Sequence, residues 1–307
     1  MTGHIPVLYN ECINALMPGK GGLFVDGTLG GAGHSKGLLE AGNINLIGID
    51  KDEDAIVRCT EYLKDFAGRV TFVKDDYKNI KRILCELQID GIDGALLDLG
   101  VSSFQIDTIE RGFSYSEEAP LDMRMDKSSG LSAYEVINEY DKNDLKRILF
   151  EYGEEKFAPV IVNAIIKNRP IATTTQLAEI IKNAIPAAAR RTGGNPAKRT
   201  FQAIRIEVNA EINGLEEAIY SFIEVLNPGG RLAVISFHSL EDRAVKQAFK
   251  RAENPCTCPP DFPVCVCGKK PLGKQLTRKP ILPSAEENEE NKRAHSAKLR
   301  VFERMDN

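Results

Sequence analysis

The sequence predicts an α/β protein in which a sheet of mainly parallel strands carries an inserted helical domain. Two observations lead to this prediction. Short apolar runs alternate with helical patterns over the first part of the chain, and a similar pattern returns near its end. Between these parts, helical patterns follow one another without an apolar strand. We therefore expect residues 1–105 and 206–307 to build the sheet domain and residues 106–205 to form the all-helical insertion.

Residues 23–50 form the stretch around which the other elements are arranged. An apolar run ends at Asp26, a glycine-rich turn follows from Gly27 to Gly33, and a second apolar run ends at Asp50. Glycines allow a sharp turn and a close approach of ligand to backbone, and a carboxylate after the second strand can hold the two hydroxyls of a ribose. The stretch therefore indicates a ligand with a nucleoside, and a purely structural glycine turn is the alternative.

The glycine spacing and the acid ahead of the turn narrow the choice of ligand. Gly31, Gly33 and Gly37 give GxGxxxG instead of the GxGxxG of dinucleotide sites, and Asp26 precedes the turn. An acid at this place favours a cationic ligand, because a phosphate prefers the uncompensated positive end of the following helix. S-adenosylmethionine, which carries an ammonium and a sulfonium, fits these residues better than NAD.

Two later strand ends bring further side chains to the same edge of the sheet. One apolar run ends shortly before Tyr77, and another ends at Asp98. Because parallel strands present their carboxyl ends on one edge, we expect both residues to join Asp26 and Asp50 at one crevice. An aromatic ring and an acid at this place can stack on an adenine and bond to it. A half-buried tyrosine in a turn and a simple helix cap are the alternatives.

Further elements follow from periodicity and capping signals. Ser132 with Glu135 predicts a capping box at the start of a helix, and a loop rich in charge, glycine, serine and proline precedes it. Other helices are expected at residues 52–66, 80–87, 144–151, 157–167, 175–184 and 200–226, with strands at 231–236 and 296–304.

Composition limits the class of protein and its location. Hydrophobic residues make up 42% and charged residues 27%, and no apolar run reaches the length of a membrane span. The start, MTGHIPVLYNE, lacks a charged region followed by an apolar one, so we expect no signal peptide, no membrane partner and a cytoplasmic location.

The net charge of -4 argues against a uniformly basic nucleic-acid binder. Local basic clusters can still bind phosphates or be solvated surface; they include Arg190, Arg191, Lys198, Arg199, Arg205, Lys269, Lys270, Lys274, Arg278 and Lys279.

The seven cysteines fall into two groups. Three are scattered through helical patterns, where we expect buried thiols: Cys12, Cys59 and Cys85. Four others form two CxC pairs that can bind a tetrahedral Zn²⁺, remain reduced surface thiols or act as a redox pair. A stable structural disulfide is not expected without a secretory signal. The four residues are Cys256, Cys258, Cys265 and Cys267.

Eight short motifs follow one another along the chain: HIPVLYNE, VDGTLGGAGHS, GIDKD, LLDLGVSS, ERGFSY with PLDMRMD, YGEEKFA, RTFQAIRIEVNAE and ISFHSLEDR. In this order they resemble the motifs of bacterial small-subunit ribosomal RNA (cytosine-N4)-methyltransferases, which use S-adenosylmethionine. The resemblance covers nearly the whole chain. It implies a class I, Rossmann-like methyltransferase sheet with a helical insertion that meets RNA, and a decoding-site cytosine as substrate.

The resemblance also implies which residues contact the cofactor. The family often has glycine at the position of Ala32, which should matter little if only the backbone amide is used. Many members lack the two CxC pairs, so we expect no metal in the mechanism. The implied cofactor residues are Ala32, Gly33, His34, Asp50, Tyr77, Asp98 and Gln105.

Methyl transfer to the exocyclic amine of cytosine requires in-line geometry and relief of the conjugation that weakens N4 as a nucleophile. Acceptors for the N4 protons would concentrate electron density on the nitrogen, and Asp98, Ser102 and Ser103 are the candidates. Asp98 can instead serve chiefly the cofactor. The chain lacks the (D/N/S)PPY tetrad of other amino-methyltransferases.

Other residues are candidates for substrate contacts. Phe237 and His238 follow a strand and can stack on a flipped base. Lys198, Arg199 and Arg205 can bind backbone phosphates.

The expected partner is small-subunit ribosomal RNA, in an assembled or assembling subunit, and a homodimer is left open. Two alternatives from other classes remain: an NAD(P)-dependent oxidoreductase and a non-catalytic RNA-binding assembly factor. A methyltransferase for another RNA, a protein or a small molecule is an alternative within the same class.

Overall fold

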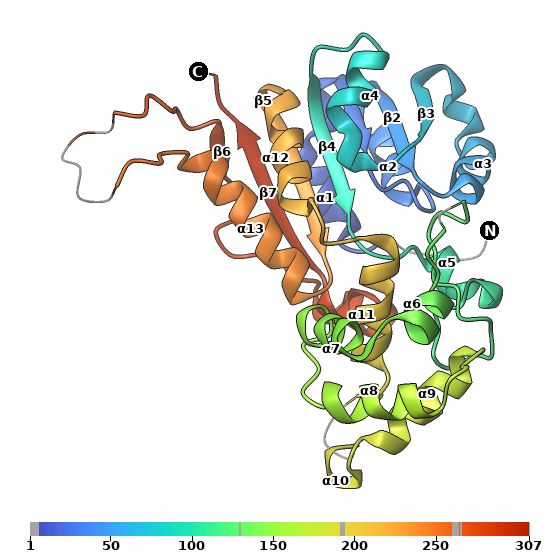
Figure 1. The fold of residues 1–307 in the computed structure, drawn as a ribbon. Helices are drawn as coiled ribbons and strands as arrows, with labels where there is room; N and C mark the ends of the chain where they lie inside the picture. The colour runs from blue at the N-terminus through green and yellow to red at the C-terminus, as the bar shows by residue number, and fades with distance from the viewer. Residues whose placement is uncertain (1–5, 129, 191–193, 260–263, 265, 307) are drawn as a thin grey trace. The chain divides into compact units, whose positions relative to one another are not determined.

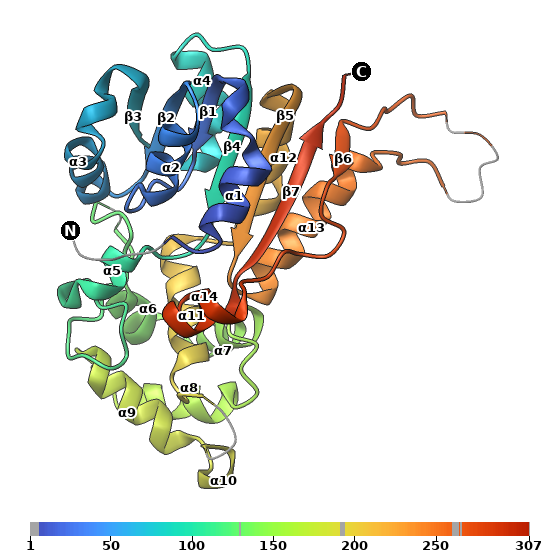
Figure 2. The ribbon, with the colours of Figure 1, turned by 180° about the vertical axis from the view of Figure 1, so that it is seen from behind.

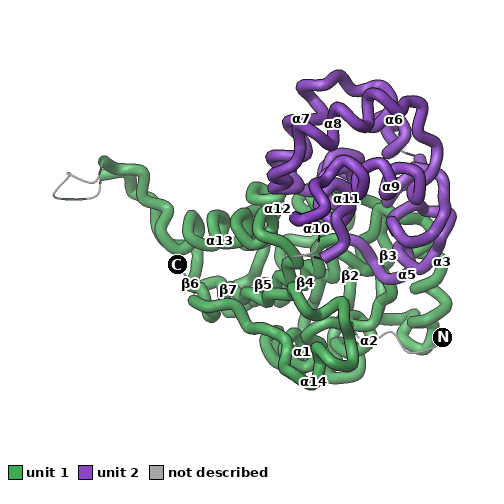
Figure 3. Tube along the Cα trace, turned by 90° about the horizontal axis from the view of Figure 1, so that it is seen from below, with its two compact units in different colours: residues 1–100, 214–307 green, residues 101–213 purple. Residues whose placement is uncertain are grey.

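The structure is a computed structural model that describes residues 6–128, 130–190, 194–259, 264 and 266–306. Its contacts divide the chain into two compact units, shown in Figure 3: unit 1, which is Met1–Gly100 with Gly214–Asn307, and unit 2, which is Val101–Asn213. Unit 2 begins before residue 106 and ends after residue 205, the limits expected for the insertion. The reason is that the helices α5 (Ser103–Asp107) and α11 (Lys198–Asn209) each cross one of those limits.

Unit 1 is built on a seven-stranded sheet with the strand order β3-β2-β1-β4-β5-β7-β6 (Figure 1). The first five strands are parallel, β7 is antiparallel to β5, and β6 is antiparallel to β7. Buried apolar residues dominate the central strands, as a parallel sheet covered on both faces requires. The strands are β1 (Gly22–Asp26), β2 (Ile44–Asp50), β3 (Val70–Lys74), β4 (Ile92–Asp98), β5 (Leu226–Ser236), β6 (Gly273–Gln275) and β7 (Lys298–Arg304).

Helices cover both faces of this sheet. α1 (Tyr9–Leu16), α2 (Gly33–Ala41) and α3 (Glu53–Tyr62) pack on one face, shown in Figure 2. α4 (Ile80–Glu86), α12 (Leu215–Val225) and α13 (Ser239–Glu253) cover the other face, shown in Figure 1. None of the helices in the described part of the chain has the length and apolar composition needed to cross a bilayer. The remaining helical elements of unit 1 are α14 (Ala285–Glu290), η1 (Pro18–Lys20), η2 (Lys64–Arg69), η3 (Tyr77–Asn79) and η5 (Ala294–Ser296).

The strand order places a switch point between β1 and β4. β2 and β3 continue the sheet on one side of β1, and β5 continues it on the other side of β4. In open α/β sheets, ligands bind outside the carboxyl ends of the strands at such a point. The predicted α/β class is confirmed, and the switch point directs attention to Asp26 and Asp98, which end β1 and β4.

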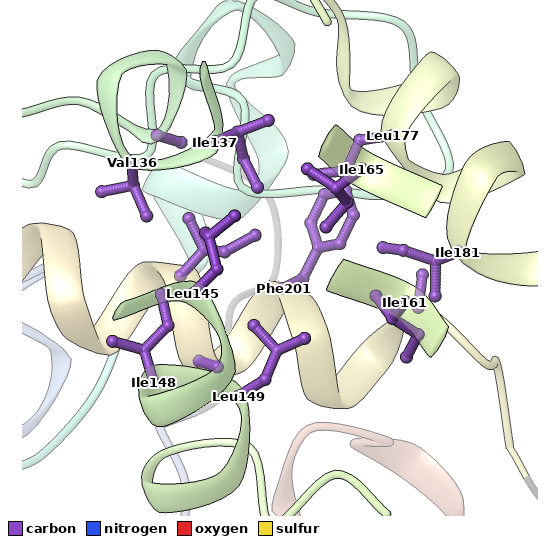
Figure 4. Packing of buried hydrophobic residues seen from close by; sticks show 14 of the residues in the cluster. Val136, Ile137, Leu145, Ile148, Leu149, Ile161, Ile165, Leu177, Ile181 and Phe201 are labelled. Carbon is purple, nitrogen blue, oxygen red and sulfur yellow. The ribbon is translucent and has the colours of Figure 1, made fainter. Parts of the chain in front are cut away.

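Unit 2 is helical around an apolar core, part of which Figure 4 shows. The Phe201 side chain of α11 lies among isoleucine and leucine side chains from the neighbouring helices. The predicted capping box is present, because the Ser132 hydroxyl accepts from the first-turn backbone and Glu135 accepts from the Ser132 amide. The other elements are α6 (Ala133–Glu139), α7 (Lys142–Glu151), α8 (Ala158–Lys167), α9 (Thr174–Ala184), α10 (Ala187–Arg190) and η4 (Ile109–Arg111).

The long helix expected over residues 200–226 is wrong, because the chain forms two helices, α11 and α12, in its place. Ala210 adopts a left-handed conformation with φ 48°, and the Glu211 amide donates to the Ile206 carbonyl, which closes the end of α11. Gly214, with φ 71°, then precedes α12. Apolar periodicity continues through this break, so the pattern alone did not reveal it.

The structure differs from the sequence analysis in two smaller points. Cys85 is exposed on α4, whereas Cys12 and Cys59 are buried as predicted. The short edge strand β6 was not predicted, since three residues carry too little pattern to be recognised. His4, the first residue of the motif HIPVLYNE, lies outside the described residues.

Candidate functional site

The glycine-rich turn between β1 and α2 is bonded to the ends of two other strands. The Asp98 backbone amide donates to the Thr28 hydroxyl at 2.6 Å, which ties the turn to the end of β4. The Gly30 amide donates to the Asp50 carboxylate at 2.9 Å, which ties it to the end of β2. The turn is therefore held in place at the switch point of the sheet before any ligand arrives.

Asp26 supports this turn from inside the protein. The residue is 2% exposed, and its carboxylate accepts from the Ser35 hydroxyl at 2.6 Å and from the Thr28 amide at 3.1 Å. Burial raises the pKa of Asp26 to about 6, and nearby Asp50 raises it further, while the two hydrogen bonds oppose the change. Asp26 therefore positions the glycine-rich turn, and its charge can act on a ligand only through longer-range electrostatics.

Asp50 ends β2 with a half-buried carboxylate. Its two oxygens accept from the amides of Gly30 and Asp52, each at 2.9 Å. Burial raises the pKa of Asp50, and these hydrogen bonds oppose that change. Each carboxylate oxygen can accept more than one hydrogen bond, so the group keeps capacity for the ribose hydroxyls expected there.

Asp98 is the most perturbed acid of the site. Its Oδ2 lies 3.8 Å from Nδ1 of His34, while Oδ1 is buried without a hydrogen-bond donor among the described residues. Burial raises the pKa of Asp98 to about 8, with Asp26 and then Glu241 adding repulsion. A buried acceptor without a donor is costly, and a ligand that supplies a donor or a positive charge removes that cost.

His34 lies beside this acid, and Tyr9 stacks on His34. His34 is 5% exposed, its Nε2 lies 3.0 Å from the Val7 carbonyl oxygen, and its ring stacks with that of Tyr9 at 6.2 Å between centroids. These contacts fix the ring plane of His34, so that Nδ1 faces Asp98.

Tyr77 lies close to the glycine turn. A Cβ atom at Gly27 would come within 3.2 Å of the Tyr77 Cβ and 2.5 Å of a Leu97 methyl group, so only glycine fits there. The Tyr77 ring is 6.5 Å from that of Phe222, between centroids. The half-buried ring is therefore held at the end of β3 by packing, where an adenine was expected to stack.

The backbone conformation of Ala32 explains why glycine is common at this position in the family that the motifs resemble. It has φ 57°, a left-handed conformation that costs a residue with a Cβ roughly 1 kcal/mol. Its methyl group is buried at 1% exposure, which offsets part of this cost. Gly33 begins α2, and a Cβ there would lie 2.4 Å from Cγ of Pro6, so the close approach also requires glycine.

Ser102, Ser103 and Gln105 belong to unit 2, where they start α5. The Ser102 hydroxyl accepts from the Gln105 amide at 3.2 Å, and Gln105 Oε1 accepts from the Ser102 amide at 3.1 Å. This capping box gives Ser102 a structural role that its position in the motif did not reveal. Gln105 is buried at 6% exposure.

Phe237 and His238 follow β5 in unit 1, and His238 caps α13. The His238 Nδ1 accepts from the Glu241 amide at 3.4 Å, and the Phe237 amide donates to the Glu241 carboxylate at 2.8 Å. His238 Nε2 lies 3.1 Å from Glu241 Oε1, and its side chain is 9% exposed. The His238 ring is thus fixed by the start of the helix, while Phe237 is half-buried against the core of unit 1.

The basic candidates of unit 2 differ in what they contact. Lys198 and Arg199 are exposed, and Arg199 donates to the Glu154 carbonyl at 3.0 Å. Arg205 donates from Nε and Nη2 to the two carboxylate oxygens of Glu211, both at 2.9 Å. The turn at Ala210 brings Glu211 back to Arg205, so this arginine serves an internal ion pair.

The cysteine pairs lie between α13 and β6, away from the strand ends described above (Figure 1). Sγ atoms of Cys256, Cys258 and Cys267 all lie within 4.8 Å of one another. Cys265 lies outside the described residues.

The residues at the strand ends fit S-adenosylmethionine. Acids end β1, β2 and β4, burial raises the pKa of each, and two of them feel a neighbouring acid of the same group. A cationic ligand relieves this repulsion, whereas a pyrophosphate would add to it. Thr28 and Glu241 also shape the site and were not predicted, although both lie inside recognised motifs.

Comparison with known proteins agrees with this site. The model of the MraW methylase family matches residues 1–305. A protein of Agathobacter rectalis named ribosomal RNA small subunit methyltransferase H 2 is 56% identical over 311 residues, covering 99% of this chain and 98% of its own. Proteins of Lachnospira eligens and Carboxydothermus hydrogenoformans, both named ribosomal RNA small subunit methyltransferase H, are 55% and 52% identical, with 98% of each chain covered.

Among solved structures, an rRNA methylase from Streptococcus thermophilus has a TM-score of 0.40 and 11% identity, covering 97% of this chain and 94% of its own. We draw no conclusion from a likeness at this level. The resemblance of the eight motifs to methyltransferases that use S-adenosylmethionine is confirmed by the family match and the relatives of high identity. The chain belongs to the MraW methylase family.

Proposed function

We propose that this protein transfers a methyl group from S-adenosylmethionine to the exocyclic N4 of a cytosine in small-subunit ribosomal RNA. The family match and the names of the relatives support methyl transfer to this RNA. The observation that carries the proposal is Oδ1 of Asp98, a buried acceptor without a donor among the described residues, at the switch point of the sheet. The choice of N4 and of a decoding-site cytosine follows from the motif resemblance.

S-adenosylmethionine supplies an electrophilic methyl group on a positively charged sulfur. In our proposal Asp50 accepts from the ribose hydroxyls, Tyr77 stacks on the adenine, and Asp98 accepts from a donor of the cofactor. The turn residues Ala32 and Gly33 contribute backbone groups, and His34 holds its place beside Asp98. Gln105, in unit 2, is proposed as a cofactor residue from the resemblance alone.

Our proposal for the substrate relies on fewer contacts. Lys198 and Arg199 remain proposed phosphate ligands because their side chains are exposed. Arg205 is the weakest of the three candidates, since Glu211 holds its guanidinium with two hydrogen bonds. For the flipped cytosine we favour Phe237 over His238, because the His238 ring already caps α13.

The acceptor for the N4 protons is also part of the proposal. Asp98 remains the first candidate, although a carboxyl group with a pKa of about 8 must lose its proton before it can accept one. Ser103 is the second candidate, since the Ser102 hydroxyl already accepts a backbone hydrogen bond in its capping box. An assembled or assembling subunit as substrate, a homodimer and a cytoplasmic location stay predictions.

A direct assay tests the proposed reaction. Purified protein is incubated with labelled S-adenosylmethionine and either naked ribosomal RNA or small subunits from cells that lack the enzyme, and the modified nucleoside is mapped. We expect label on the N4 of one cytosine and a large loss of label with Asp98→Ala. The control variant is Asp65→Ala, which removes an exposed acid in η2. Label on another position of the base, on protein, or on no macromolecule contradicts the proposal.

A further inference from the structure

A segment of unit 1 between α13 and β6 has no apolar core of its own. None of the described residues in the range 254–272 is buried, and Val264 and Val266 are 70% and 72% exposed. Figures 1 and 2 show the described parts of this segment running away from α13 and β6. A connection of this length without secondary structure is uncommon in a compact domain and needs another source of order.

The base of the segment is closed by hydrogen bonds. The Leu272 amide donates to the Ala252 carbonyl at 2.8 Å, so the chain leaves and returns at the same place. Glu253, the last residue of α13, accepts from the backbone and side-chain amides of Gln275 at 3.2 and 2.9 Å. Cys256 and Cys258 lie on the arm that leaves this closed base, and Cys267 lies on the arm that returns to it.

Three thiols from the two arms converge. The Sγ atoms of Cys256, Cys258 and Cys267 all lie within 4.8 Å of one another, although Cys267 is far along the chain from the other two. The distance from Cys267 Sγ to Cys256 Sγ is 3.9 Å. A disulfide requires about 2.05 Å between sulfurs, so these two are not joined to each other.

The distance between Cys267 Sγ and Cys256 Sγ matches a tetrahedral metal site. With Zn–S bonds of about 2.3 Å, sulfurs at two corners of a tetrahedron lie about 3.8 Å apart. The Val266 amide also donates to Cys258 Sγ at 3.3 Å, and Gly268, directly after Cys267, has a left-handed φ of 66°. An amide donor to sulfur is typical of the surroundings of a metal thiolate. A glycine in this conformation lets the backbone turn tightly beside a cysteine that binds a metal.

We propose that Cys256, Cys258 and Cys267 bind a structural Zn²⁺ ion that cross-links the two arms of this segment. Each thiol that binds loses its proton to solvent, and the ion is neither oxidised nor reduced. Thiolate ligands select zinc over magnesium or calcium, which prefer oxygen. The ion supplies the order that the missing apolar core cannot, and the methyl-transfer site described above does not depend on this proposal.

Metal content of the full-length protein tests the site. The protein is produced in zinc-supplemented medium, purified under reducing conditions, dialysed against metal-free buffer and analysed by mass spectrometry for zinc. We expect about one zinc ion per chain in the wild type and less than about a tenth of that in Cys256→Ser and Cys267→Ser. Cys85→Ser is the matched control, since it removes an exposed thiol of α4 and should keep the ion.

Three further measurements keep the test independent of folding defects. Circular dichroism should give the same helix content for all variants, because the residues of the segment that the structure describes form no helix. Replacement of zinc by Co²⁺ should produce the sulfur-to-metal charge-transfer absorption of a tetrahedral thiolate site in the wild type and in Cys85→Ser, and not in the other two variants. Limited proteolysis within the segment should become faster when a chelator removes the ion. Wild-type protein without zinc, or zinc retained in Cys256→Ser and Cys267→Ser, overturns the proposal.

Discussion

Oδ2 of Asp98 lies 3.8 Å from Nδ1 of His34, whose other ring nitrogen is 3.0 Å from the carbonyl oxygen of Val7. A carbonyl oxygen can only accept, so Nε2 of His34 donates to Val7, and Nδ1 is the ring nitrogen that faces Asp98. The ring is thereby held beside the carboxyl group at the end of β4. The charge state of Asp98 should govern how well the site receives a cationic cofactor.

The first prediction concerns the pH dependence of cofactor binding. Asp98 has a pKa of about 8 in the folded protein, so it is largely protonated at neutral pH and ionises above that value. A ligand with a positive charge or a hydrogen-bond donor prefers the ionised form. Affinity for S-adenosylmethionine should therefore rise with pH up to about 8, by at most tenfold per unit, and then level off. Isothermal titration calorimetry at several pH values measures this.

The same shift affects the stability of the protein without ligand. Because the folded-state pKa of Asp98 lies above the unfolded value of about 4, the folded state binds the extra proton between about pH 4 and 8, and stability falls as pH rises through this window. Asp98→Asn should remove this contribution and flatten the affinity profile. A wild-type affinity for S-adenosylmethionine that stays constant between about pH 6 and 9 would contradict this link between ionisation of Asp98 and cofactor binding.

The second prediction concerns the buried hydrogen bond from Ser35 to Asp26, 2.6 Å long. Ser35→Ala leaves one carboxylate oxygen without its donor and should lower the free energy of unfolding by about 1–3 kcal/mol. The bond lowers the pKa of Asp26, which means that it favours the ionised form. Asp26 has a pKa of about 6 in the folded protein. The loss of unfolding free energy should therefore be larger above this pH, where the carboxyl group is ionised, than below it, where the group is protonated. Urea denaturation at two pH values measures the difference.

An exposed bond of the same kind provides the control for Ser35. The Ser128 hydroxyl donates to the Asp126 carboxylate at 2.7 Å, and both partners lie near the surface. Ser128→Ala should change stability by less than about 0.5 kcal/mol. If the two serine variants lose the same free energy, burial is not the reason for the effect.

The third prediction separates a capping role of Ser102 from a catalytic one. Ser102→Ala should release the first turn of α5 at a cost of about 1 kcal/mol, whereas Ser102→Asp should restore the cap, because aspartate is an equally good N-cap residue. Hydrogen exchange of the α5 amides measures the helix, and the methyl-transfer assay measures the reaction. Should Ser102→Asp protect the helix and yet abolish methyl transfer, the hydroxyl has a role beyond the cap.

The fourth prediction separates the arginines of α11. Arg205→Ala leaves Glu211 without two hydrogen bonds and should destabilise the protein by about 1–3 kcal/mol. Arg199→Ala should leave stability nearly unchanged, weaken RNA binding, and reduce the salt dependence of that binding by about one unit of slope. Thermal unfolding and binding titrations at several salt concentrations measure both effects.

A double-mutant cycle with Glu211→Ala provides the control for Arg205. The loss from Arg205→Ala should be smaller when Glu211 is already absent, because the pair interacts directly. Additive losses, together with an RNA-binding defect in Arg205→Ala alone, would restore Arg205 as a phosphate ligand.

The strand ends could be predicted because each carries two signals at once. An apolar run that ends in Asp26, Asp50 or Asp98 reports both the strand and the polar edge, and parallel pairing then brings the acids to one side. The capping box of Ser132 and Glu135 was predictable for a similar reason, since its two residues lie within one helical turn.

Other features depend on contacts that no local pattern contains. The left-handed turn at Ala210 ends α11 and brings Glu211 to Arg205, although apolar periodicity runs on through this turn. The conformation of Ala32, with φ 57°, is set by the bonds and packing of the turn before α2 and not by its own preference. Both features are consequences of how the backbone closes on itself.

The sequence by itself determined three features. Apolar periodicity determined the α/β class, acids at the strand ends determined the edge of the sheet where they gather, and the order of motifs determined the family. Tertiary structure alone decided which of these acids carries the most perturbed charge. Desolvation and repulsion act through space. The strand pattern predicted that Asp26 and Asp98 share one edge of the sheet, but only the folded chain shows that Glu241 also acts on Asp98 and that burial is the largest cause of its raised pKa. The two CxC pairs already suggested a metal site, and the fold adds that the thiols of Cys256, Cys258 and Cys267 lie within 4.8 Å of one another.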